Sequence, residues 1–120
     1  MNPDTARSFR NASAAYRVRE ECAEAYAVAL ETRQQAQKAL VAAASTDDKR
    51  AFANAVFASD RAEAAVRSAQ ERYRASRESF ADRAEAFFTS FCAWKDIDPS
   101  SENLEGVLRE SLQLVKGGKR

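Results

Sequence analysis

The chain has 120 residues and a formal net charge of +1, with 31% of its residues charged. This balance points to neither a nucleic-acid nor a membrane partner, and no apolar run approaches the roughly 20 residues that span a bilayer. With no histidine, three glycines and two cysteines, the chain lacks the usual general base, zinc ligand sets and phosphate-binding loops, so we expect no enzymatic activity, no catalytic residue, no metal and no cofactor.

The first predicted element is a helix over residues 5–44. Asp4 or Thr5 is expected to cap its first amide groups. Small residues recur along it at alternating intervals of three and four, which is typical of a coiled coil. The predicted contact line is formed by Ala15, Val18, Cys22, Ala25, Ala29, Thr32, Ala36, Ala39 and Ala43.

The second predicted element is a helix over residues 47–96. It follows a polar break at residues 45–48, and we expect Ser45 or Thr46 to cap it. So short a break forces the two helices to run antiparallel. The predicted contact line on this helix is formed by Phe52, Ala55, Ser59, Ala62, Val66, Ala69, Tyr73, Ser76 and Phe80, continuing to Phe87 and Trp94.

A third, shorter helix is predicted over residues 99–116. Asp98 and Pro99 provide a start signal, and Gly117 provides a stop. The predicted fold is therefore all-α, a long antiparallel alanine-rich coiled-coil hairpin with a short C-terminal helix packed on its aromatic end. Residues 1–116 are expected to form a single helical domain, and residues 117–120 a basic flexible tail.

The register of the predicted hairpin places Phe9 opposite Asp82 and Tyr16 opposite Ala75. The second helix then extends beyond the first, which leaves an aromatic end. The candidate partner-binding residues at this end are Phe87, Phe88, Phe91 and Trp94. The alternative interpretation is a small core completed by the third helix.

Phe57 is a further candidate partner-binding residue. It lies off the predicted contact line and near the turn, where two hairpin tips could pack together in a homodimer. A single exposed phenylalanine is also an ordinary feature of protein surfaces.

A basic patch is predicted where the start of the first helix meets the second helix. Arginine binds phosphate and carboxylate groups equally well. The alternative is an ordinary solvated surface of mixed charge, because acidic residues are interspersed. The patch comprises Arg7, Arg10, Arg17, Arg19, Arg72, Arg74, Arg77 and Arg83.

These features predict a non-enzymatic helical module for protein–protein interaction: an adaptor, a chaperone-like cofactor or an inhibitor of a larger complex. It would bind a protein partner of unknown identity through the aromatic end or the arginine-rich face. The alternatives are a nucleic-acid-associated protein that uses the arginine patch and a self-assembling structural coiled coil. The first residues lack the charged-then-apolar order of a signal peptide, so a cytoplasmic location without a membrane partner is expected.

Overall fold

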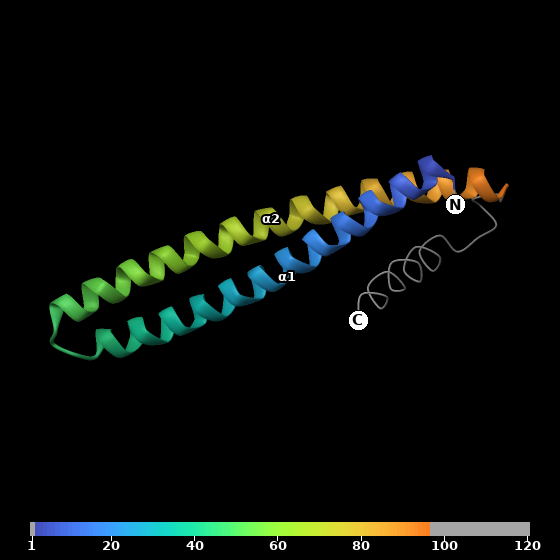
Figure 1. Cartoon of the computed structure of the whole chain (residues 1–120). Helices are drawn as coiled ribbons and strands as arrows, with labels where there is room; N and C mark the ends of the chain where they lie inside the picture. Colours follow the sequence, from blue (N-terminus) through green and yellow to red (C-terminus); the bar gives the residue numbers. More distant parts are fainter. Residues whose placement is uncertain (1, 97–120) are drawn as a thin grey trace. The chain divides into compact units, whose positions relative to one another are not determined.

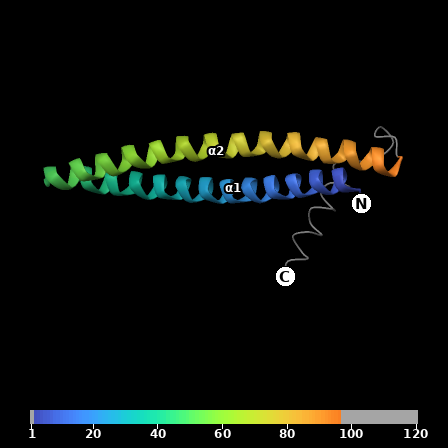
Figure 2. The same ribbon diagram turned by 45° about the horizontal axis from the view of Figure 1, so that its top comes forward.

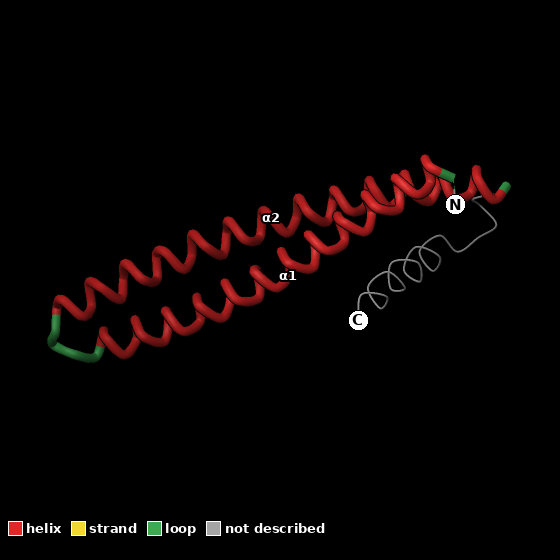
Figure 3. Tube along the Cα trace, viewed as in Figure 1, coloured by secondary structure: helices red, strands yellow, loops and turns green. Residues whose placement is uncertain are grey.

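The computed structural model describes residues 2–96, which form two long helices and no strand within that range. Helix α1 spans Pro3–Ala44 and helix α2 spans Lys49–Lys95 (Figure 1). A loop joins them, and Figure 3 shows helix on both sides of it. The all-α class is confirmed. The predicted third helix over residues 99–116 and the tail over 117–120 lie outside the described residues.

Helix α1 begins two residues earlier than predicted, and Asn2 caps it in place of Asp4 or Thr5. The side-chain oxygen of Asn2 accepts a hydrogen bond from the Thr5 backbone N–H at 2.8 Å. Pro3 occupies the first helical position, where its missing N–H costs nothing. A cap of this kind satisfies one of the amide groups that a helix start leaves without a partner.

Three polar side chains form hydrogen bonds at the turn, and the helix end that each one caps differs from the prediction. The hydroxyls of Ser45 and Thr46 donate to the carbonyls of Ala42 and Ala43, each at 2.8 Å, and so close the end of α1. The Asp48 carboxylate accepts hydrogen bonds from two backbone N–H groups at the start of α2, both at 3.1 Å. The cap of α2 is therefore Asp48, because Ser45 and Thr46 are used by the preceding helix.

The chain divides into two compact units, and each helix contributes to both. Unit 2 contains residues 21–75 and includes the turn. Its two helical segments lie side by side in both views (Figures 1 and 2). The rings of Tyr26 and Tyr73 lie 6.1 Å apart between centroids, and Ala62 and Val66 are buried. Unit 2 is a helical hairpin.

Unit 1 contains the described residues 2–20 and 76–96. Its segments also run antiparallel, because contacts that start early in α1 end late in α2. Phe9 packs on Phe87 with ring centroids 5.1 Å apart, and Tyr16 packs on Phe80 at 5.6 Å. The buried core consists of Ala12, Ala84, Phe87, Phe88 and Cys92, with Phe9, Phe80 and Phe91 packed against it.

The predicted contact line of α2 is largely confirmed. Ala62, Val66 and Ser76 are buried, and the residues between them at three-four spacing are half-buried. The exception is Phe52, which is exposed. One column of this line, spaced by seven residues, is small throughout: Ala55, Ala62, Ala69 and Ser76.

Only half of the predicted contact line of α1 is confirmed. The column Ala15, Cys22, Ala29, Ala36 and Ala43 is buried or half-buried, but Val18, Ala25, Thr32 and Ala39 are exposed. The second column of the observed contact line consists of Ala12, Arg19, Tyr26, Arg33 and Leu40. The last four of these each follow an exposed residue of the predicted line by one position, and their larger side chains cover more apolar surface.

The predicted register is wrong by five residues along α2. Phe9 contacts Phe87 rather than lying opposite Asp82, and Tyr16 contacts Phe80 in place of Ala75. Phe87 therefore does not extend beyond α1. Ring-to-ring packing adds about 0.5–1.5 kcal/mol per pair beyond area burial, and this favours the observed alignment.

Candidate functional site

The aromatic residues near the end of α2 form a chain of ring contacts. Phe87 and Phe91 lie 5.9 Å apart between ring centroids, and Phe91 and Trp94 lie 6.0 Å apart. The Lys95 ammonium sits 4.1 Å from the centre of the Trp94 ring. Phe87 and Phe88 are only 1% and 3% exposed, so these two side chains belong to the core of unit 1. Phe91 and Trp94 are half-buried and keep some accessible surface.

Phe57 is the exposed member of the predicted partner-binding set, with 66% of its surface accessible. It lies two residues from both Ala55 and Ser59, which are half-buried on the contact line of α2. Two residues correspond to about 200° around a helix, so Phe57 faces away from α1. Large apolar residues are also exposed elsewhere in unit 2, at Val28, Val41 and Phe52.

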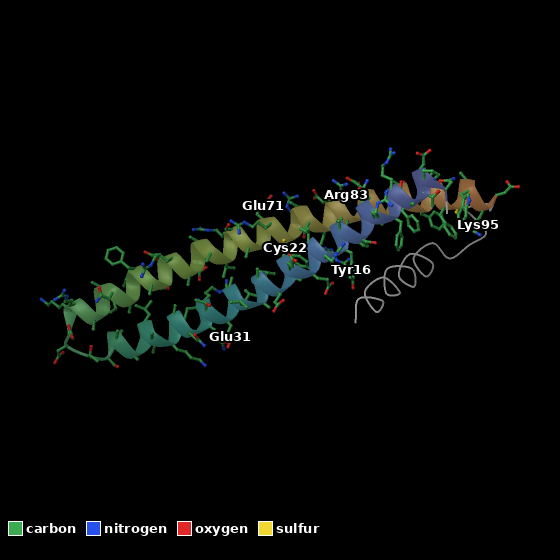
Figure 4. All side chains as sticks on the ribbon, viewed as in Figure 1. Tyr16, Cys22, Glu31, Glu71, Arg83 and Lys95 are labelled. Carbon is green, nitrogen blue, oxygen red and sulfur yellow. The ribbon has the colours of Figure 1, made fainter. Side chains whose placement is uncertain are left out.

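Arg19 is part of the contact between the helices rather than of an open patch. Its guanidinium lies 4.9 Å from the centre of the Tyr16 ring and 4.6 Å from that of Phe80. It also forms an ion pair with Glu20 at 3.5 Å. A guanidinium that stacks on two rings shields apolar surface and loses part of its freedom to bind a phosphate. Figure 4 labels Tyr16, on whose ring Arg19 stacks, and Arg83, which belongs to the same unit.

Two predicted patch residues of α2 are engaged along their own helix. Arg74 forms an ion pair and hydrogen bonds with Glu71, which projects from α2 (Figure 4). The hydrogen bond from Arg74, followed by its charge, lowers the pKa of the Glu71 carboxyl below its ordinary value. Arg83 donates from Nε to the Ser79 hydroxyl at 3.3 Å.

Arg7, Arg10 and Arg17 form the exposed basic face of α1. They are separated by three and seven residues, so they project from one side of the helix. All three are exposed and belong to unit 1, as do Arg77 and Arg83. Arg72 and Arg74 belong to unit 2. The predicted set of eight therefore divides between the two units, and Arg7, Arg10 and Arg17 share one exposed face of α1.

A polar cluster in unit 2 was missed by the sequence analysis. Glu63 accepts a hydrogen bond from Gln37 at 3.3 Å and forms an ion pair with Arg33 at 3.8 Å. The sequence feature that could have predicted this cluster is the position of Arg33, fourteen residues after Arg19 and in the same column of α1. Two arginines in one heptad column indicate side chains that lie along the partner helix with their charges at the edge.

A shallow depression lies on the surface of unit 1. Its lining is small and chemically mixed: Asn11, Ala14, Ala15, Val18, Ser76, Ser79 and Arg83. Within residues 2–96 no group of three or more cysteine, aspartate or glutamate side chains is placed to hold a metal ion. Neither α1 nor α2 has an apolar stretch that could cross a membrane.

Two surfaces of the described residues are therefore accessible and chemically distinct: the Phe57 face of unit 2 and the Arg7, Arg10 and Arg17 face of unit 1. No protein family model, curated protein or solved structure matches the chain.

Proposed function

We propose that this protein is a non-enzymatic helical module that binds a larger protein partner as an adaptor, a chaperone-like cofactor or an inhibitor. The observation that carries the proposal is the 66% exposure of Phe57 on the side of α2 that faces away from α1. Full burial of a phenylalanine side chain is worth about 1.5–3 kcal/mol, so a partner that covers Phe57 gains from doing so.

The surroundings of Phe57 support a binding role. Its neighbours three and four residues away on α2 are Ala53, Asn54, Asp60 and Arg61, and all of them are exposed. Three of these four neighbours are polar or charged. An aromatic side chain with a mainly polar rim is the usual composition of a binding hot spot, because the rim excludes water from the anchor. By contrast, Phe87 and Phe88 of the predicted aromatic end are already buried. Phe91 and Trp94 are the members of that end with surface left for a partner.

The same proposal includes the finer architecture that the sequence predicts. We expect an alanine-rich coiled coil with a third helix over residues 99–116, acting in the cytoplasm. Within unit 2, small residues recur in one column of each helix: Ala29, Ala36 and Ala43 on α1 and Ala55, Ala62 and Ala69 on α2. These columns support close helix packing. A helical segment presents its exposed side chains in fixed positions, which lowers the entropic cost of binding.

Affinity capture from the source cell tests the proposal when it is done with variants. The intact chain is compared with Phe57→Ser, with Val28→Ser as a matched control because Val28 is also exposed in unit 2. We expect one protein to be retained by the intact chain and by Val28→Ser and to be lost from Phe57→Ser. With the purified partner, loss of a hot-spot anchor should weaken binding by about thirtyfold. Equal retention by all three forms would refute a role for Phe57.

Binding of nucleic acid through the basic face of α1 is the second candidate. It is favoured by the exposure of Arg7, Arg10 and Arg17 along one helix side. Fluorescence anisotropy with labelled single-stranded and duplex DNA at two salt concentrations tests it, since each phosphate neutralised steepens the salt dependence. Arg10→Ala should flatten that dependence relative to Arg61→Ala, which lies in unit 2. No binding at low salt would remove this candidate.

Self-assembly as a homodimer or structural coiled coil is the third candidate, and the exposed Val41 and Phe57 of unit 2 favour it. It predicts a second species in light scattering that grows with protein concentration and disappears in Phe57→Ser. A single monomeric species over the whole concentration range would exclude it.

A further inference from the structure

Burial in unit 1 differs between the two sides of its helix pair. On one side Ser13 of α1 and Phe88 and Cys92 of α2 are buried. On the other side Val18 of α1 and Ala93 of α2 are exposed. A serine is covered here while a valine is left in water, so the difference does not follow residue type. It follows the side of the pair, and this indicates a cover on one side only.

Helix α1 does not supply that cover for α2. Ser90 points toward α1, because its hydroxyl lies 2.8 Å from that of Thr5. Phe88 and Cys92 are each two residues from Ser90, or about 200° around the helix, so both lie on the far side. They are four residues apart and form one stripe with Ala84, which is also buried.

The buried Ser13 belongs to the same side of the pair. It lies one residue beyond Ala12, which is fully buried on the contact line of α1, and so it is turned about 100° away from that line. Its hydroxyl oxygen is enclosed without a hydrogen-bond partner in the part of the chain that the structure describes. An open helix edge would leave this hydroxyl in contact with water.

The chain itself continues from the end of this stripe. Helix α2 ends at Lys95, and Asp96 adopts a left-handed conformation with φ of 55°, which turns the backbone out of the helix axis. The Asp96 N–H donates to the Ala93 carbonyl at 3.4 Å. The residues that follow, 97–120, carry large apolar side chains at spacings of three and four: Leu104, Val107, Leu108, Leu112 and Val115.

We infer that residues 97–120 dock on the far face of α2 in unit 1, formed by Ala84, Phe88 and Cys92, and also cover Ser13 of α1. This segment is tethered next to the face, and its apolar side chains match a stripe that is already buried. A second copy of the chain or another protein would have to reach the same face from solution, at a larger cost in translational freedom. The inference stands apart from the role proposed for Phe57, because it concerns a different unit.

Reaction of the Cys92 thiol with a water-soluble thiol reagent tests the inference in the full chain carrying Cys22→Ser, where Cys92 is the only cysteine. We expect Cys92 to react at least roughly tenfold more slowly than in the unfolded chain. Leu108→Asp should remove most of this protection, whereas the matched variant Arg109→Asp should keep it. Equal protection in both variants would overturn the inference. Protection that is lost on dilution would also overturn it, in favour of a second copy.

A second measurement guards against a Leu108→Asp chain that fails to fold. In the Cys22→Ser chain, cysteines are introduced one at a time by Leu104→Cys, Leu108→Cys or Leu112→Cys, with Arg109→Cys as the control. A disulfide with Cys92 requires Cα atoms within about 7 Å. We expect a monomeric disulfide in at least one of the leucine variants and none in the control. No disulfide in any leucine variant would refute docking on this face.

Discussion

The hydroxyl of Thr5 lies 2.8 Å from that of Ser90 and donates to the Ser90 carbonyl at 3.3 Å, across 85 positions of sequence. Thr5 is completely buried, so this contact joins the start of α1 to the last turns of α2 within the core of unit 1. Removing one partner from a buried hydrogen bond costs about 1–3 kcal/mol, because the other group stays desolvated.

We therefore expect Thr5→Val, which keeps the shape of the side chain, to lower the free energy of unfolding by about 1–3 kcal/mol in urea denaturation. Ser90→Ala should cost less, since Thr5 can still donate to the carbonyl of residue 90. The double variant should cost less than the sum of the two single changes, because the residues interact directly. Strict additivity would show that the contact contributes nothing in solution.

The small column of α2 makes a second prediction. Ala62 is buried and belongs to the contact line, whereas Ala64 lies two residues away and is exposed. Ala62→Leu should destabilise the protein by about 1–3 kcal/mol through overpacking. Ala64→Leu should leave stability almost unchanged, since both residues favour helix. Thermal unfolding followed by circular dichroism measures both. A melting temperature for Ala62→Leu at or above the parental value would contradict the assigned contact line.

The enclosed hydroxyl of Ser13 makes a third prediction. A buried hydroxyl without a hydrogen bond costs about 1–3 kcal/mol relative to an apolar group of similar size. Ser13→Ala should therefore raise the free energy of unfolding, by up to about that amount, while Ser68→Ala at an exposed position of α2 should change it little. A loss of stability in Ser13→Ala would mean that the hydroxyl has a partner, such as an ordered water molecule.

The ion pair between Glu71 and Arg74 makes a fourth prediction. The pKa of Glu71 is lowered, first by the hydrogen bond from Arg74 and then by its charge, so Glu71 should titrate below the ordinary glutamate range in a carboxyl-detected NMR titration. Arg74→Gln should return the midpoint to that range. Because the folded-state pKa is depressed, any contribution to stability is present above the unfolded-state pKa and is lost as the pH falls through the folded one. Glu71 is exposed to solvent, so this contribution is small.

The contact line of α2 could be read from the sequence because its large residues stand out from its alanines. Val66, Tyr73 and Phe80 repeat every seven positions, and the residues beside them in the sequence are alanine, serine or arginine. Helix α1 gives no such contrast, because alanine stands both at the exposed position 25 and at the half-buried position 29. Apolar residues also occur on several sides of this helix. The sequence therefore located one of its columns and misplaced the other.

The predicted register and the predicted helix caps were wrong for different reasons. Columns of small residues match one another at many alignments, so they could not choose between Asp82 and Phe87 as the partner of Phe9. The ring pairs decide this, and they form only when the helices are brought together. At the turn, Ser45 and Asp48 are both good cap residues, and which helix end each serves depends on the path of the backbone.

The contacts of individual patch arginines could not be predicted either. Side-chain charge was read as accessible charge, but the Arg19 guanidinium stacks on two rings and Arg74 is paired along its own helix. The exposed Phe57 was located correctly as a residue off the contact line, since its position follows from helical spacing alone.

The seven-residue recurrence along α2 also governs how the two helices could slide past each other. The ring-bearing positions Tyr73, Phe80 and Phe87 share the interval of the small column, so a displacement by one heptad would again place rings opposite rings. It would also separate Thr5 from Ser90, and this contact therefore distinguishes the observed alignment from its heptad-shifted neighbour. The short polar link acts in the same direction, because its Thr46 and Asp48 side chains bond to opposite helix ends and leave no spare length between them.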